Sequence, residues 1–299
     1  MNNPPIFLIP LKRTGGTLFV SMLGCHSKLT LSYEIYEEHL RPERKNGVSA
    51  IEMKKILEDS YDTKPLKWLN NIESGSIRSF TACARRGGLE IVDVLDTLKS
   101  FICHGGNFIT VDGRLSYIDL LMRKASIKFN TEYWGGKAKV DSKILQSRHP
   151  NAVFFFMLRD GRDVLASQLI NGNFNTNVLK SAIEWRNYLV NFKEFKSNED
   201  SRVMLVKYEE LVAYPEKTLR QAFKLIGIPF EATTLNYQKQ DLTLLKNPHG
   251  HLSHKSISKG LQDSSIGRYK KDLSKEQIQE YESVNMDLLS EYNYLMKEF

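Results

Sequence analysis

Short apolar runs alternate along this chain with segments whose apolar residues recur three and four positions apart. The runs predict buried strands at residues 5–10, 29–32, 151–158 and 203–206. The periodic segments predict helices at residues 17–25, 48–57, 89–98, 117–122, 178–195, 215–226 and 274–296. Strands alternating with helices favour parallel strands joined by right-handed crossovers. We therefore predict an α/β fold whose central parallel sheet is flanked by helices.

The stretch from residue 38 to about residue 130 is mainly helical in its pattern. We interpret it as an insertion into a single domain spanning residues 1–299, and we expect it to carry part of a substrate site. Its basic residues could line an acidic substrate, but solvated helix faces are the simpler interpretation. They are Arg78, Arg85, Arg86, Lys99 and Arg114.

A polar, glycine-containing turn joins the first strand to the first helix. Backbone N–H groups in such a turn converge with the N-terminus of the helix, where the dipole favours an anion. Glycines allow a close approach of the backbone, while hydroxyl and basic side chains add donors and charge. The sequence therefore predicts a phosphate-binding loop formed by Lys12, Arg13, Thr14, Gly15, Gly16, Thr17 and Leu18.

This loop is not that of the nucleotide triphosphatases. Their motif, G-x-x-x-x-G-K-[ST], places a lysine and a magnesium-binding hydroxyl after the glycines. Here no lysine follows Gly16, and the basic residues precede the glycines.

A second buried-strand run ends in Arg159-Asp160-Gly161-Arg162-Asp163-Val164-Leu165-Ala166-Ser167. With the first loop, this stretch resembles sulfotransferases that use 3′-phosphoadenosine 5′-phosphosulfate (PAPS), particularly their tyrosylprotein- and carbohydrate-like branch. Their loops read roughly [RK]-[ST]-G-[TS]-T and R-D-x-R-x-x-x-x-S. Two later segments, residues 206–211 and 265–269, resemble the family's Y-E-[DE]-L and I-G-R-[WY] elements. The resemblance implies a P-loop NTPase-like fold and a sulfotransferase enzyme with PAPS as donor.

The resemblance also implies roles for individual residues. Arg13 and the loop would hold the 5′-phosphosulfate, and Arg159 and Ser167 the 3′-phosphate. Lys137 matches a lysine that approaches the transferring group. The other residues expected to bind the donor are Tyr208, Lys259, Gly260 and Arg268. The chain departs from the family at Gly16, where a hydroxyl residue is usual, and at Lys139, where a proline is usual.

Glu34 falls where the tyrosylprotein-type relatives carry their general base. Strand ends in open α/β sheets point towards the ligand site, so a carboxylate after the second strand suits that role. Glu37 and Glu38 could also serve, followed by His39 and His26.

The 42 Lys and Arg residues exceed the 35 Asp and Glu residues, giving a net charge of +7. This excess suits an anionic ligand, but no Lys/Arg-rich run indicates nucleic-acid binding. His249, His251 and His254 have no cysteine or carboxylate among them, so we expect no metal site there. With three cysteines, no apolar run near ~20 residues and no secretory leader, we expect a cytoplasmic protein without a membrane span.

Two other functions remain open. A metal-dependent nucleotide phosphotransferase would need a lysine and a hydroxyl after the glycines. A non-catalytic binder of nucleotides or sulfated glycans could keep the fold without turnover. For the enzyme, a saccharide or a small alcohol or phenol is the favoured acceptor, and a peptide tyrosine is also open. The sequence leaves the oligomeric state undetermined.

Overall fold

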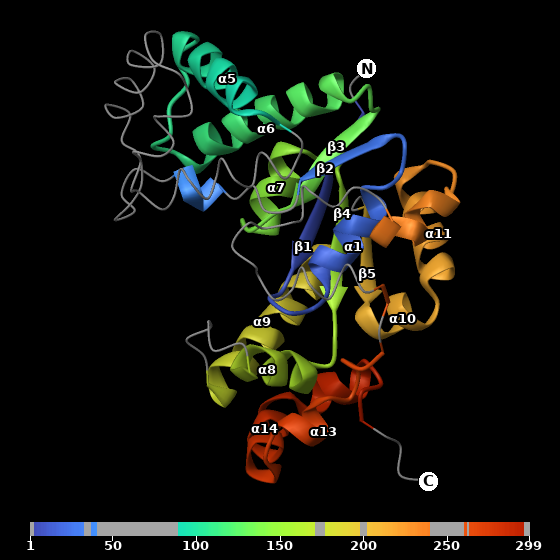
Figure 1. Ribbon diagram of the computed structural model, residues 1–299. Helices are drawn as coiled ribbons and strands as arrows, with labels where there is room; N and C mark the ends of the chain where they lie inside the picture. The colour runs from blue at the N-terminus through green and yellow to red at the C-terminus, as the bar shows by residue number, and fades with distance from the viewer. Residues whose placement is uncertain are drawn as a thin grey trace. The chain divides into compact units, whose positions relative to one another are not determined.

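The computed structural model describes residues 3–32, 37–40, 89–170, 177–197, 202–239, 260–261 and 263–295. Its elements follow one another in the α/β alternation expected from the sequence (Figure 1). They are β1 Ile6–Pro10, α1 Gly16–Leu23, β2 Leu29–Ser32, η1 Glu37–Leu40, α5 Ile91–Cys103, α6 Val111–Lys128, β3 Tyr133–Lys137, α7 Ser142–Arg148, β4 Val153–Leu158, α8 Gly161–Ile170, α9 Val178–Lys196, β5 Arg202–Lys207, α10 Tyr208–Ala213, α11 Pro215–Ile226, η2 Ala232–Lys239, α13 Tyr269–Asp272 and α14 Lys275–Glu291.

The strands form a five-stranded sheet in the order β2-β3-β1-β4-β5. β2 pairs parallel with β3, Leu29 opposite Tyr133, and β4 pairs parallel with β5, Val153 opposite Arg202. All six residues of β4 are buried, as expected of a continuous apolar run with both faces covered. The predicted fold class, a central parallel sheet flanked by helices, is confirmed.

The chain divides into two compact units. Unit 1 comprises residues 1–7, 20–152 and 231–258, and unit 2 comprises residues 8–19, 153–230 and 259–299. Within the described residues, no helix is both long and apolar enough to cross a bilayer.

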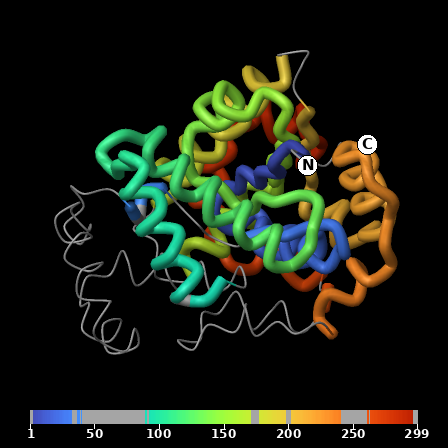
Figure 2. The backbone as a smooth tube through the Cα atoms, turned by 90° about the horizontal axis from the view of Figure 1, so that it is seen from above, coloured from blue at the N-terminus to red at the C-terminus, as the bar shows by residue number. Residues whose placement is uncertain are grey.

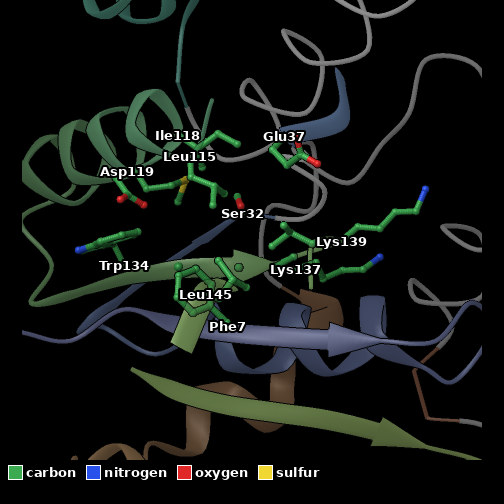
Figure 3. Close-up of a pocket in the computed structure, with 15 residues that line it drawn as sticks. Phe7, Ser32, Glu37, Leu115, Ile118, Asp119, Trp134, Lys137, Lys139 and Leu145 are labelled. Atoms are coloured by element: carbon green, nitrogen blue, oxygen red, sulfur yellow. The ribbon is translucent and has the colours of Figure 1, made fainter. Parts of the chain in front are cut away.

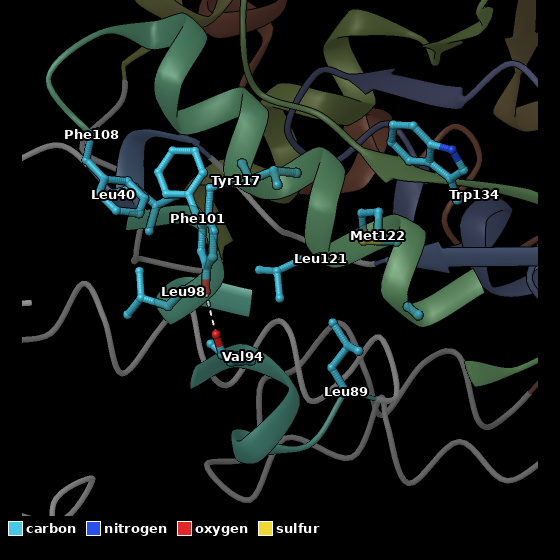
Figure 4. Close-up of a cluster of buried hydrophobic side chains, with 12 residues drawn as sticks. Leu40, Leu89, Val94, Leu98, Phe101, Phe108, Tyr117, Leu121, Met122 and Trp134 are labelled. Carbon is cyan, nitrogen blue, oxygen red and sulfur yellow. Dashed lines mark hydrogen bonds between the residues drawn. The ribbon is translucent and has the colours of Figure 1, made fainter. Parts of the chain in front are cut away.

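In unit 1, α5 lies alongside α6, and α6 packs on β2 and β3 (Figure 1 and Figure 2). The helices enclose a buried cluster that also receives Trp134 from β3 (Figure 4). Inside it the Tyr117 hydroxyl donates to the Val94 carbonyl at 2.9 Å, which satisfies a buried polar group. α5 and α6 confirm the helical pattern expected for the later part of the insertion. Residues 41–88, including the helix predicted at 48–57, lie outside the described residues.

In unit 2, α9 and α14 pack together around a cluster that includes Trp185, Leu189 and Tyr281. The helix ends follow the sequence signals. Ser274 and Gln277 form a capping box that begins α14. Gly227, at a φ of 89°, ends α11 in the left-handed conformation that glycine adopts readily.

Several elements differ from the sequence prediction, α5 and α6 among them, and two of these differences have a clear structural cause. Residues 133–137, which were not among the predicted strands, form strand β3. Glycine is required there by crowding, because a Cβ on Gly135 would overlap the Ile6 carbonyl and one on Gly136 would overlap Ser32. The last helix ends at Glu291 rather than near residue 296, since Asn293 adopts a left-handed φ of 60°.

Candidate functional site

The predicted phosphate loop lies in unit 2 and has a strained backbone. Arg13 has a φ of 72° and Gly15 a φ of 90°. A positive φ is uncommon for a residue with a side chain, and such outliers cluster at binding sites. A Cβ on Gly15 would lie 2.5 Å from a ring carbon of Tyr208, so only glycine allows this approach. Tyr208 is thus part of the loop's support.

The residues on either side of Gly15 also shape the loop. The Thr14 hydroxyl is buried and donates to the Leu11 carbonyl at 2.7 Å. A side chain on Gly16 would meet Pro10, with Cβ atoms 2.7 Å apart. This crowding explains why Gly16 stands where related loops carry a hydroxyl residue.

Arg159 extends from the end of β4 towards the same loop. Its guanidinium donates to the Arg13 carbonyl at 3.1 Å and to the Ser265 carbonyl, and it lies 4.7 Å from the centre of the Tyr208 ring. The Arg13 Nε in turn donates to the Ser167 hydroxyl at 2.9 Å. The structure therefore brings together Arg13, Arg159, Ser167 and Tyr208, which the sequence analysis assigned to one donor site.

Three guanidinium groups crowd this site. Burial lowers the pKa of Arg13, and the positive charges of Arg159 and Arg268 lower it further. Like charges held in a partly buried place are unfavourable unless an anion joins them. The Nε of Arg159 is buried and has no hydrogen-bond partner among the described residues. An orphaned buried donor beside a cluster of arginines fits an anionic group such as a phosphate.

Two residues that the sequence analysis did not assign to the site position it. The Asp163 carboxylate accepts the N–H groups of Gly267 and Tyr269 at 2.8 and 3.0 Å, which fixes the segment that carries Arg268. The Trp185 indole donates to the Arg159 carbonyl at 3.0 Å. Asp163 lies four residues after Arg159, on the helix that also carries Ser167, but the backbone N–H groups that it binds have no signature in the sequence.

Lys137 belongs to unit 1, where it ends β3 and is buried. It lines a pocket with Ser32, the last residue of β2, and with Glu37 from η1 (Figure 3). Glu34 and Lys259 lie outside the described residues. Gly260 has a φ of 82°, and Lys12 is exposed.

Arg114, expected on a solvated helix face, is instead buried with 4% of its surface exposed. Its Nε donates to the Glu37 carboxylate at 2.6 Å, and a terminal nitrogen donates to the Phe108 and Ile109 carbonyls at 2.8 Å. The amphipathic pattern could not reveal this burial, because the partner carboxylate lies 77 positions away in the sequence. Glu37, a possible base in the sequence analysis, is therefore held in an ion pair.

Arg114→Met should lower the free energy of unfolding by about 3–5 kcal/mol, because it leaves the buried Glu37 charge unpaired. Lys128→Met on the same helix breaks the more exposed pair with Asp93, 2.7 Å long, and should cost under about 1 kcal/mol. Chemical denaturation of both variants measures the difference. Equal effects would contradict a structural role for the buried pair.

Comparisons with known proteins point to one family. A family model described as "Sulfotransferase family" matches residues 117–232. A protein-tyrosine sulfotransferase of Drosophila melanogaster is 25% identical over 107 residues, which cover 34% of this chain and 21% of the relative. Protein-tyrosine sulfotransferase 2 of Gallus gallus is 28% identical over 104 residues, 33% of this chain and 28% of the relative. The matched segments therefore cover less than a third of the length of either curated relative.

Solved structures share the fold along almost the whole chain. The sulfotransferase domain of the Synechococcus PCC 7002 olefin synthase has a TM-score of 0.58 at 20% identity, covering 95% of both chains. The sulfotransferase domain of the curacin biosynthetic pathway has a TM-score of 0.55 at 14% identity, covering 96% of this chain and 98% of the other. A mouse sulfotransferase complexed with PAP has a TM-score of 0.50 at 10% identity, covering 98% and 89%. These structures show the shared fold, and the family-model match over residues 117–232 confirms the resemblance to sulfotransferases.

Proposed function

We propose that this chain, which carries the sulfotransferase fold and matches the family in sequence, is an enzyme that transfers a sulfuryl group from PAPS to an acceptor hydroxyl. One observation carries the proposal. Arg13, Arg159 and Arg268 converge in unit 2, with the buried Arg159 Nε left without a partner among the described residues. Arg268 pairs with Asp272 at 2.7 Å and Arg159 lies 3.9 Å from Asp163, so a donor with phosphate at both ends of its ribose would add negative charge beside Arg13 and at the Arg159 Nε. A relative of the same fold, described as complexed with PAP, supports this choice.

We assign the binding of the donor to the loop and to the end of β4. Arg13 and the N–H groups of residues 15–17 hold the 5′-phosphate end. Arg159 and Ser167 hold the 3′-phosphate, since a guanidinium and a hydroxyl suit its oxygens. Tyr208 keeps Gly15 and Arg159 in place. Thr14 shapes the loop through its bond to Leu11, and we assign Thr17 to donate its hydroxyl to the phosphate.

The donor supplies an activated sulfuryl group whose leaving group, adenosine 3′,5′-bisphosphate (PAP), departs with additional negative charge. The residues of the chain stabilise that charge and fix the positions of the reacting groups. In our proposal Arg13 meets the charge on the leaving phosphate, and Lys137 meets the oxygens of the transferring group. A carboxylate after β2 accepts the proton of the acceptor hydroxyl.

Glu34 is our candidate for that carboxylate, since Glu37 is already paired with Arg114. Glu34→Gln should lower kcat by about 100-fold or more while the Kd for PAP stays the same, because general-base catalysis contributes ~10²–10⁴-fold. The matched variant Glu38→Gln, which breaks a pair with Lys139, should keep kcat within about threefold. Steady-state kinetics with calorimetry of PAP binding measure both. Normal turnover in Glu34→Gln would move the base to another group.

Transfer of labelled sulfate from PAPS is the test of the activity itself. Incorporation into a hydroxyl acceptor supports the enzyme. Binding of PAP without transfer to any acceptor class would favour a non-catalytic binder. Transfer of phosphate from ATP with magnesium would identify a phosphotransferase instead. Transfer should occur with EDTA present, because the positive charges that act on the donor are side chains of the chain.

A further inference from the structure

A pocket runs between helix α6 and strand β3 within unit 1 (Figure 3). We call it the α6–β3 slot. Its volume is about 430 Å³, open mouth included. Its apolar lining comes from α6, β3, β1 and α7, and its polar lining comes from the ends of β2 and β3 and from η1. Among the lining residues are Leu115, Ile118, Met122, Trp134, Phe7 and Leu145, with Ser32, Glu37, Lys137 and Lys139.

One end of the slot is lined by apolar side chains. Trp134 stands with Phe7 in an edge-to-face contact, ring centres 6.3 Å apart, and Leu145 completes that side. Leu115 and Ile118 face them from α6, as Figure 3 shows. These side chains present carbon rather than hydrogen-bonding groups, so a ligand that enters here gains by removing apolar surface from water.

Glu37, Lys137 and Lys139 lie at the opposite end, whereas Asp119 lies beside Trp134 (Figure 3), and the carboxylates already have partners. Glu37 is bound by Arg114, and Lys139 binds Glu38 at 2.6 Å. Asp119, the remaining carboxylate in the wall, accepts from Arg148 at 2.8 Å. A carboxylate neutralised by an arginine does not attract a cation, and a lysine bound to a glutamate attracts an acidic peptide weakly. The described part of the slot therefore favours an uncharged, apolar ligand.

The slot is linked to the reaction by Lys137. This residue forms part of its polar end, and it is also the lysine that we assign to the transferring group. Ser32 lies at the same end, on the strand next to β3, so two strand termini meet there. Ligands of parallel α/β sheets bind at the carboxyl ends of the strands.

We propose that the α6–β3 slot binds the hydrocarbon part of the acceptor, which is an alcohol or phenol with an apolar body, and that the hydroxyl lies at the Ser32–Lys137 end. This rests on the proposed sulfuryl transfer. In that step the hydroxyl oxygen forms a bond to sulfur while the bond from sulfur to the phosphate oxygen breaks. The electron pair leaves with adenosine 3′,5′-bisphosphate, and the hydroxyl proton passes to the carboxylate base. A saccharide or an acidic tyrosine peptide does not match this lining.

Calorimetry of primary alkanols from butanol to decanol tests the slot without any donor present. Each methylene that enters should lower the Kd about fourfold, until the slot is full. Methyl glucoside and a tyrosine peptide flanked by aspartates serve as the competing acceptor classes. Affinity independent of chain length, or tighter binding of the glucoside or the peptide, would overturn the proposal.

Variants on α6 show whether the alkanols occupy this slot rather than another apolar surface. Leu115→Ala removes three carbons from the wall, so the chain length at which affinity stops rising should grow by about two or three carbons. Ile118→Val removes one carbon, so it should extend that chain length by about one carbon. Leu120→Ala on the exposed face of the same helix is the matched control and should change nothing. If the dependence of affinity on alkanol chain length were identical in the unaltered protein and all three variants, the assignment of the alkanols to this slot would be overturned.

The test separates the slot from the proposed activity. Alkanol binding without PAP binding would keep the slot and refute the sulfotransferase. PAP binding with no alkanol binding would refute the slot alone. The alkanol that binds most tightly should then accept labelled sulfate from PAPS. If another acceptor class is sulfated and this alkanol is not, the assignment of the slot to the acceptor is also refuted.

Discussion

Arg159→Ala is expected to weaken the binding of PAP by at least about 100-fold, or ~2.7 kcal/mol, with a matching rise in the KM for PAPS. The buried guanidinium has an unpartnered Nε beside two other arginines, and losing one member of a desolvated charge pair costs about 2–5 kcal/mol. Isothermal titration calorimetry with PAP measures the loss directly.

Arg220→Ala is the control for this variant. Its guanidinium is exposed on α11 and paired with Glu216, outside the donor site. PAP affinity should stay within about twofold of the unaltered protein. Because Arg159 also bonds to the carbonyls of Arg13 and Ser265, circular dichroism should accompany the titration. Unchanged PAP affinity in a folded Arg159→Ala protein would refute the 3′-phosphate assignment.

Arg13→Gln is expected to lower kcat/KM for PAPS by about 10³-fold, because it removes the charge that we assign to the leaving phosphate. The same change should leave the midpoint of thermal unfolding of the free protein unchanged or raise it. Burial and the charges of Arg159 and Arg268 depress the Arg13 pKa, so the charged form is disfavoured on folding, and a neutral side chain relieves that repulsion.

The two measurements together distinguish a binding role from a structural one. Loss of turnover with undiminished stability is the signature of a residue placed for a ligand. Arg162→Gln supplies the contrast, because Arg162 is buried among Asp160, Glu282 and the Tyr294 carbonyl. It should destabilise the free protein strongly. A loss of stability in Arg13→Gln as large as that in Arg162→Gln would contradict our assignment.

Local sequence signals predicted the loop and the second stretch whose residues the structure brings together. The loop at Arg13–Thr17 and the stretch from Arg159 to Ser167 each contain a strand end, a turn and a helix start, and such elements are set by residues close together in the sequence. The structure brings Arg13 and Ser167 into hydrogen-bond contact across 154 positions. That contact follows from parallel β topology, which the strand–helix alternation had indicated.

Features that depend on distant contacts could not be predicted. Strand β3 was not predicted, since glycine is depleted in strands, yet the Ile6 and Ser32 backbones leave room for no larger residue at Gly135 and Gly136. The sequence pattern placed Arg114 on a solvated helix face, because its partner Glu37 is far away in the sequence. Asp163 acts on a segment about a hundred residues later through backbone N–H groups, which carry no sequence signature. Glu34 and Lys259 lie outside the described residues, and their roles stay predictions.

The most direct test of the central claim is a thermal-shift titration of the whole chain with adenosine 3′,5′-bisphosphate, ADP and ATP with magnesium. At a hundredfold excess over Kd, a bound nucleotide adds ~2.7 kcal/mol of stability, enough to raise the unfolding midpoint by several degrees. We expect that rise with the 3′,5′-bisphosphate and little with ADP, which lacks the 3′-phosphate that Arg159 and Ser167 would bind. A rise with ATP and magnesium alone, or none with the 3′,5′-bisphosphate, would contradict the assignment of a PAPS site.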